Sequence, residues 1–178
     1  PEENVALVKD VLSVHSGIDI AILNGGIASK GRSVADTEPE ELWQLVATHA
    51  LGPHQLCRAL IPSMRTRGRG DIVFISSVAT SGMSANGAPY NMGKAAMEAL
   101  ALTLAKEERP HGIRVNIVAP GLVETDMGVR LARAMTGRRE MEDLRSMDDA
   151  APFGRVCQPE DIAAAVLWFC SPSASYIT

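Results

Sequence analysis

The residues best suited to acid–base chemistry are a serine, a tyrosine and a lysine in the stretch SSVATSGMSANGAPYNMGK, which runs from Ser76 to Lys94. Tyr90 and Lys94 are one helical turn apart, so on a helix their side chains share a face. A nearby ammonium favours the phenolate and lowers the pKa of a tyrosine from its usual value of about 10, which makes Tyr90 a candidate acid and base. The Ser77 hydroxyl can donate a hydrogen bond to a substrate oxygen. Together the three residues predict proton transfer at an alcohol or carbonyl oxygen.

Three short apolar runs predict the strands that hold these residues. They cover residues 18–26, 71–77 and 113–120 and are nearly continuous, as is typical of strands buried on both faces. Helical patterns separate and follow them, at residues 39–50, 53–67, 89–109, 125–149 and 158–170. Strands that alternate with helices predict a parallel sheet with right-handed crossovers and helices on both faces.

The candidate residues follow the carboxyl ends of these strands, where ligands bind in open α/β sheets. Residues 24–26 end the first run, Ser77 ends the second, and residues 120–125 follow the third. The loop between Ser77 and Tyr90 contains two glycines, whose conformational freedom allows the chain to turn back toward the strand end. We therefore expect one site at this edge of the sheet.

Taken in order, these motifs resemble those of the short-chain dehydrogenase/reductase family: a serine after a strand, the YxxxK motif of Tyr90 and Lys94, and the PGxxxT-like segment NIVAPGLVETDM at residues 116–127. The resemblance covers nearly the whole chain. It implies an α/β fold with a Rossmann-type doubly wound parallel sheet, here lacking the N-terminal βαβ part and the last strand. Residues 1–178 would form a single NAD(P)-binding domain that is incomplete at both ends. The segments APGLVETDM and FGRVCQPEDIAAAVLWFCS are most similar to the branch with 3-oxoacyl-(acyl carrier protein) reductases and related alcohol dehydrogenases.

The resemblance also implies an NAD(P)-dependent oxidoreductase that interconverts a secondary alcohol and a ketone by hydride transfer. Tyr90 is expected to act as the acid and base, Lys94 to lower its pKa, and Ser77 to polarise the substrate oxygen. Cofactor contacts are implied for Asn24, Gly26, Tyr90, Lys94, Pro120, Gly121, Val123 and Thr125. The chain contains neither a GxGxxG motif nor the residue that selects between the two cofactors, so the expected cofactor is NAD or NADP.

Two other functions remain open. A reductase specific for 3-oxoacyl thioesters would need an elongated pocket covered by residues 127–150. The methionines of that segment either line such a pocket or serve as adaptable packing: Met127, Met135, Met141 and Met147. A catalytically silent family member would instead be a binding or scaffold protein.

The sequence departs from the family pattern at two places. The family's NNAG appears as LNGG at residues 23–26, so only Asn24 and Gly26 match. The asparagine that in many members kinks the next helix and holds a water near the lysine aligns with either His49 or Ala50. His49 could replace it in a proton relay, because an imidazole both donates and accepts, or it could be a polar helix residue. The sequence leaves these alternatives open.

Composition limits the classes of partner. A net charge of -4 without a basic stripe predicts a small-molecule carbonyl or alcohol substrate, with no nucleic-acid and no membrane partner. The isolated cysteines Cys57, Cys157 and Cys170 predict no metal site, and reduced thiols together with the lack of a signal-peptide pattern favour a cytoplasmic location.

The helices at 53–67 and 89–109 have apolar residues on more of their surface than one sheet face covers, and by resemblance they pair in a homodimer or homotetramer.

Overall fold

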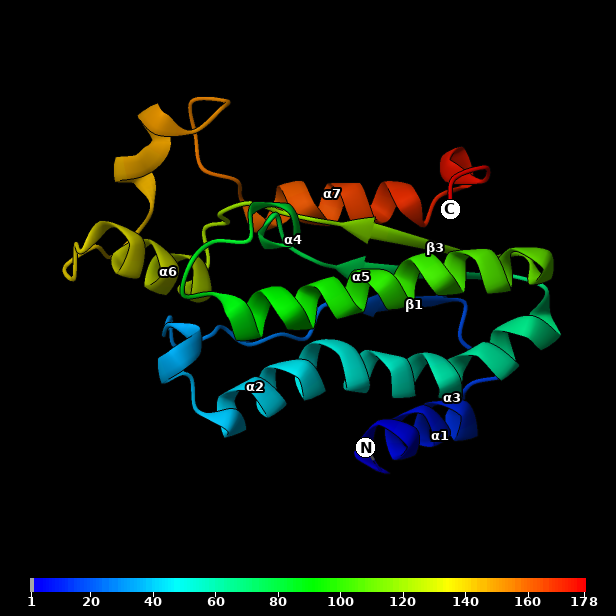
Figure 1. Ribbon diagram of the computed structural model, residues 1–178. Helices are drawn as coiled ribbons and strands as arrows, with labels where there is room; N and C mark the ends of the chain where they lie inside the picture. Colours follow the sequence, from blue (N-terminus) through cyan, green and yellow to red (C-terminus); the bar gives the residue numbers. More distant parts are fainter. Residues whose placement is uncertain (1) are drawn as a thin grey trace.

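A three-stranded parallel sheet in the order β1–β2–β3 forms the centre of the computed structural model, which describes residues 2–178 (Figure 1). The strands are β1 at Ile20–Leu23, β2 at Gly70–Ile75 and β3 at Ile113–Val118. In the register of the sheet, Val73 pairs with Ile22 on one side and with Asn116 on the other. All three strands fall at the apolar runs that predicted them. The predicted α/β fold with a parallel sheet is confirmed.

Helices cover both faces of the sheet. On one face α5, Ala88–Glu108, packs against β3, and α3, Gly52–Arg67, packs against β2. Helix α1, Glu2–Val14, packs on α3, while α2, Pro39–Val46, packs on α5. Helix α7, Pro159–Phe169, covers the opposite face over β2 and β3 (Figure 1). Strands β2 and β3 therefore lie between two layers of helices, as the alternating sequence pattern predicted. The prediction that the first strand is buried on both faces is wrong, because α7 packs on β2 and β3 and leaves Ile20 and Ile22 of β1 exposed.

The main hydrophobic core lies between the sheet and helices α3 and α5. Ile72 and Phe74 of β2 point into it, and Val73 between them is buried too. Because successive strand side chains point to opposite faces, β2 is buried on both sides. This explains why its sequence is a continuous apolar run rather than an alternating one.

One predicted helix boundary is wrong. The helix expected over residues 125–149 is confined to α6, Asp126–Thr136, which ends at Gly137 with a left-handed φ of 72°. The chain then reaches a 3₁₀ helix, η4, at Arg145–Ala150. Buried residues of this region form a second, smaller cluster: Val129, Ala132, Met141, Leu144 and Val156. Met141 lies inside this cluster and Met147 packs against it, so both contribute packing.

The two helices predicted at 39–50 and 53–67 are joined. Between α2 and α3 lies one turn of π-helix, η2, at Ala47–Leu51, in which the Gly52 N–H donates to the Ala47 carbonyl five residues earlier. Pro53 follows and has no N–H, so it cannot donate to the carbonyl of His49. A wider turn at this point is a frequent feature of functional sites. Short elements complete the fold: η1 Val34–Asp36, α4 Ala79–Gly82, η3 Arg109–His111 and η5 Pro172–Ala174.

Candidate active site

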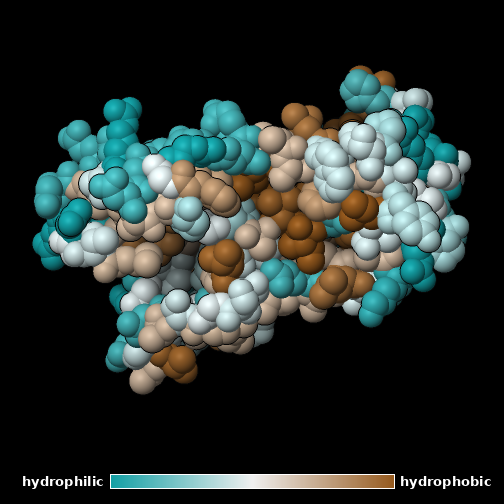
Figure 2. All heavy atoms as spheres, turned by 90° about the horizontal axis from the view of Figure 1, so that it is seen from above, coloured by the Kyte–Doolittle hydropathy of each residue, from teal (hydrophilic) through white to brown (hydrophobic). Residues whose placement is uncertain are grey.

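The candidate residues gather at the carboxyl ends of the strands. Beyond the last residues of β2 and β3, the Ser76 N–H donates to the Val118 carbonyl at 2.7 Å and the Val78 N–H donates to the Pro120 carbonyl at 3.0 Å. These bonds hold Ser77 beside the turn that follows β3. The strand ends lie at the left of Figure 1, and at the same end of the molecule Figure 2 shows a hollow in the surface.

Tyr90 is brought back to this edge by a tight loop. After α4, Met83 and Asn86 adopt left-handed conformations, with φ of 43° and 62°. Helix α5 then begins at Ala88, so Tyr90 lies in its first turn and is half-buried. Burial raises the pKa of the phenol, and the Ser77 side chain is near enough to act in the opposite direction. The serine and tyrosine predicted to act together therefore lie near each other.

Lys94 lies one turn further along α5 and is buried, with 4% of its surface exposed. Its Nζ donates to the Ile75 carbonyl at 2.7 Å and lies 5.8 Å from the centre of the Tyr90 ring. Burial disfavours the ammonium and lowers the pKa of Lys94 to about 8, while the negative charge of Glu98 acts in the opposite direction. The lysine is therefore close to losing its proton just above neutral pH.

The pKa of Tyr90 is the quantity that Lys94 is expected to lower. Burial is the largest influence on the phenol and raises the pKa of Tyr90 above its usual value of 10.0. The ammonium is itself disfavoured by burial and its Nζ is bonded to a backbone carbonyl. The named influences on the pKa of Tyr90 are its burial and the Ser77 side chain, so the expectation that Lys94 lowers this pKa stays a prediction.

His49, rather than Ala50, lies beside the tyrosine and the lysine. It is fully buried in the π turn, its Nε2 is 2.9 Å from the Ile27 carbonyl oxygen, and its ring meets that of Tyr90 edge to face at 5.2 Å. Burial lowers the pKa of His49, and the nearby Lys94 lowers it further, so the imidazole is neutral. With Nε2–H donated to Ile27, the ring offers Nδ1 as an acceptor, and within residues 2–178 this buried nitrogen has no partner.

Gly26 explains how the imidazole and the lysine fit together. A Cβ at this position would lie 3.0 Å from Cε1 of His49 and 3.8 Å from Nζ of Lys94. The first distance is too short for a comfortable contact, so a side chain here would displace the imidazole. The sequence matched Gly26 to a cofactor contact, but its packing against His49 was not expected.

The remaining predicted cofactor residues lie at the same edge. Asn24 is exposed just after β1, and Gly121 is exposed just after β3 with open space where a Cβ would stand. Val123 pairs with Cys157 in an isolated parallel bridge. Thr125 caps α6, since its Oγ1 accepts a hydrogen bond from the Gly128 N–H at 3.0 Å. Exposed backbone near Lys94 and Tyr90 fits the approach of a flat ring and its ribose, as the nicotinamide end of a cofactor would require.

Across residues 2–178 no cluster of three or more histidine, cysteine or acidic side chains is arranged to hold a metal ion. None of the helices in that range has the length and apolar character that crossing a bilayer requires.

A parallel sheet between helical layers, with polar residues collected at its carboxyl edge, is the architecture of Rossmann-type α/β proteins. Solved structures share it. The structure of an NAD+-bound xylitol dehydrogenase superposes with a TM-score of 0.88 at 24% identity, covering 99% of this chain and 71% of that one. A structure described as a "Dehalogenation enzyme" superposes with a TM-score of 0.85 at 31% identity, covering 98% and 70%.

Sequence comparisons narrow the class. A family described as "Enoyl-(Acyl carrier protein) reductase" matches residues 1–178. The human protein "Dehydrogenase/reductase SDR family member 4" is 36% identical over 178 residues, covering 99% of this chain and 62% of that protein. "Uncharacterized oxidoreductase YmfI" of Bacillus subtilis (strain 168) is 36% identical over 166 residues, covering 93% and 65%. The chain belongs to the short-chain dehydrogenase/reductase family, as the resemblance of its motifs predicted, and spans about 62% of the length of the human relative.

Proposed function

We propose that the protein is an NAD(P)-dependent oxidoreductase that interconverts a secondary alcohol and a ketone. The observation that carries the proposal is the convergence of Ser77, Tyr90 and Lys94 at one edge of the sheet, with Ser77 near a half-buried phenol and Lys94 Nζ 5.8 Å from the centre of its ring. Relatives named as a dehydrogenase/reductase and as an oxidoreductase support the same class of reaction. NAD and NADP remain equal candidates.

In the reductive direction, a bound nicotinamide would supply the hydride to the carbonyl carbon. Tyr90, protonated at neutral pH, would donate its proton to the carbonyl oxygen as negative charge develops there. Ser77 would stabilise that oxygen with a hydrogen bond, and Lys94 would favour the phenolate left behind. Asn24, Gly26, Pro120, Gly121, Val123 and Thr125, with Tyr90 and Lys94, would hold the cofactor.

The proposal is tested by following NADH and NADPH consumption by the complete protein with a panel of small ketones and acetoacetyl thioesters. Turnover with simple ketones supports the proposal. Turnover restricted to thioesters would identify a 3-oxoacyl thioester reductase. The family description names an acyl-carrier-protein enzyme, but one that acts on an enoyl group, and the packing of Met141 and Met147 offers no support for a 3-oxoacyl pocket. No turnover with either cofactor, despite cofactor binding, would favour a silent binding or scaffold protein.

His49 is expected to connect Lys94 with solvent. His49→Ala should lower turnover about tenfold, equivalent to about 1.4 kcal/mol of transition-state stabilisation, and should change the pH profile of kcat/KM. His49→Asn, whose amide can still donate and accept, should retain more of the activity. The measurements are steady-state rates across pH, with circular dichroism to verify folding. Ala50→Asn is the control and should change little; a pH profile of His49→Ala that superposes on that of the wild type would leave His49 with a packing role only.

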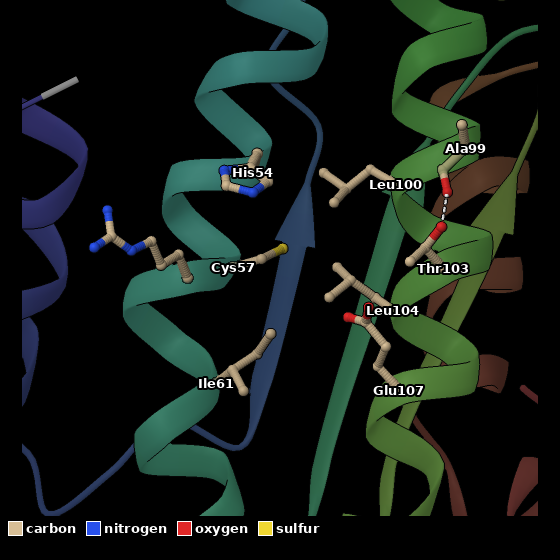
Figure 3. Close-up of a pocket in the computed structure, with 9 residues that line it drawn as sticks. His54, Cys57, Ile61, Ala99, Leu100, Thr103, Leu104 and Glu107 are labelled. Atoms are coloured by element: carbon tan, nitrogen blue, oxygen red, sulfur yellow. Dashed lines mark hydrogen bonds between the residues drawn. The ribbon is translucent and has the colours of Figure 1, made fainter.

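We also propose that two copies of the chain associate through the faces of α3 and α5. Figure 3 shows the groove between these helices, which His54, Cys57 and Ile61 approach from α3 and Leu100, Thr103 and Leu104 from α5. Small side chains such as Ala99 and Thr103 allow a second helix to approach closely. At the rim, Arg58 and Glu107 offer opposite charges to a second copy. A homodimer or homotetramer would bury this groove.

The assembly is tested by sedimentation of the complete protein at micromolar concentration. The wild type is expected to be a dimer or tetramer, and Ala99→Arg, which places a long charged side chain in the groove, is expected to shift it to smaller species. Lys106→Glu alters an exposed residue of the same helix outside the groove and should leave the assembly unchanged. A monomeric wild type would contradict the proposal.

A cytoplasmic location and the absence of nucleic-acid partners stay predictions.

A further inference from the structure

Lys94 and Glu98 lie one turn apart on α5 and are bonded to two consecutive residues at the end of β2. Lys94 Nζ donates to the Ile75 carbonyl at 2.7 Å, and the Ser76 hydroxyl donates to Oε1 of Glu98 at 2.5 Å. Ser76 is 4% exposed, and its N–H is bonded to the Val118 carbonyl at 2.7 Å, so the hydroxyl has little freedom to move. The carboxylate of Glu98 is therefore held at the same strand end as Nζ of Lys94.

The groups around Lys94 come from three parts of the fold. His49 approaches from η2 and is neutral because it is buried. Tyr90 lies on the preceding turn of α5 with a protonated phenol, and Ile75 contributes a carbonyl oxygen from the end of β2. Among residues 2–178, the carboxylate whose charge acts on Lys94 is that of Glu98. Burial disfavours the ammonium, and Glu98 supplies the opposing charge.

We propose that Glu98, held in place by the Ser76 hydroxyl, is a positioning residue that keeps Lys94 an ammonium beside Tyr90 at neutral pH. Glu98 acts through Lys94 and does not reach the reacting atoms. Its importance for turnover rests on the proposed function, whereas its effect on the protonation of Lys94 does not. The sequence offers one signal for it, an acidic residue four positions after the lysine on a helix.

The direction of the effect follows from the charges. A negative charge nearby stabilises the ammonium, so removing it lowers the pKa of Lys94 below the present value of about 8. For charges separated by one helical turn near a protein surface, the expected change is about one pH unit. Lys94 would then be about half neutral at pH 7, and a neutral amine cannot favour the phenolate of Tyr90.

The protonation of Lys94 can be measured without any assay of activity. The complete protein, labelled with ¹³C at the ε carbon of lysine, is titrated by NMR, and the signal that disappears in Lys94→Met identifies Lys94. The midpoint is expected near pH 8 in the wild type and about one unit lower in Glu98→Gln. Ser76→Ala, which keeps the charge but releases the carboxylate, should shift the midpoint in the same direction by less. Glu160→Gln, at an exposed position of α7, should leave it unchanged.

Kinetics then separates the two proposals. If Lys94 takes part in catalysis, the alkaline limb of kcat/KM moves with the NMR midpoint in both variants. A shifted midpoint in a protein without turnover would contradict the proposed function and leave the role of Glu98 intact. Midpoints of Glu98→Gln and Ser76→Ala that coincide with that of the wild type would overturn the role of Glu98. If Glu98→Gln does not fold, Ser76→Ala alone decides by the same criterion.

Discussion

Tyr90→Phe is expected to lower turnover by about 10²–10⁴-fold while the protein stays folded and still binds its cofactor. General acid catalysis contributes about this factor, and the substitution deletes the phenolic hydroxyl without changing the ring that meets His49 at 5.2 Å. Most of the proposed cofactor contacts come from other residues. Steady-state kinetics and a cofactor-binding titration measure the two parts of this expectation.

The chain contains a matched control for this variant. Tyr176, the second tyrosine, is fully exposed and distant in sequence from the site, so Tyr176→Phe should behave as the wild type. Near-normal turnover in Tyr90→Phe would remove Tyr90 from the mechanism. Loss of cofactor binding together with turnover would instead indicate that the phenol mainly holds the cofactor.

Lys94→Met is expected to abolish most activity and at the same time to stabilise the fold at neutral pH. Burial lowers the pKa of Lys94 from 10.5 to about 8, which corresponds to a cost of about 3 kcal/mol for holding the ammonium in the folded state. Methionine fills a similar volume without that cost but loses the hydrogen bond to the Ile75 carbonyl, worth about 1–2 kcal/mol. A net gain of about 1–2 kcal/mol in the free energy of unfolding is expected from these two contributions.

The stability gained by Lys94→Met is expected to depend on pH. Between about pH 8 and pH 10 the unfolded lysine still carries a proton that the folded lysine has released, so the stability of the wild type rises with pH. The advantage of Lys94→Met should therefore shrink over that range. Urea denaturation of both proteins at several pH values measures it, with Lys106→Met as the control at an exposed position. An advantage that does not change with pH would mean that Lys94 is not a buried ammonium.

Much of the fold and the position of the site could be predicted from local sequence. The runs at 18–26, 71–77 and 113–120 are short and apolar at successive positions, as is typical of strands in a parallel sheet, although the first of them is exposed in part. Parallel strands place their carboxyl ends at one edge, so Ser77, the YxxxK pair and the turn at Pro120 had to come together. The end of α6 was missed, although Gly137 marks it, because the apolar pattern continues into Met141 and Leu144, which pack in the second cluster without being helical.

The sequence by itself determined the order of strands and helices, the edge at which the polar residues meet, and the family. Only the tertiary structure decided whether His49 or Ala50 takes the position beside Lys94. A single π turn changes which of the two side chains faces the lysine, whereas a one-residue shift in the alignment hardly changes the local sequence pattern. The tertiary structure likewise decided the directions in which the pKa values of Tyr90 and Lys94 shift, since desolvation depends on every element packed around a group. The carboxylate of Glu98 acquires its position from Ser76, a residue of another element, through a contact that no spacing along the chain encodes.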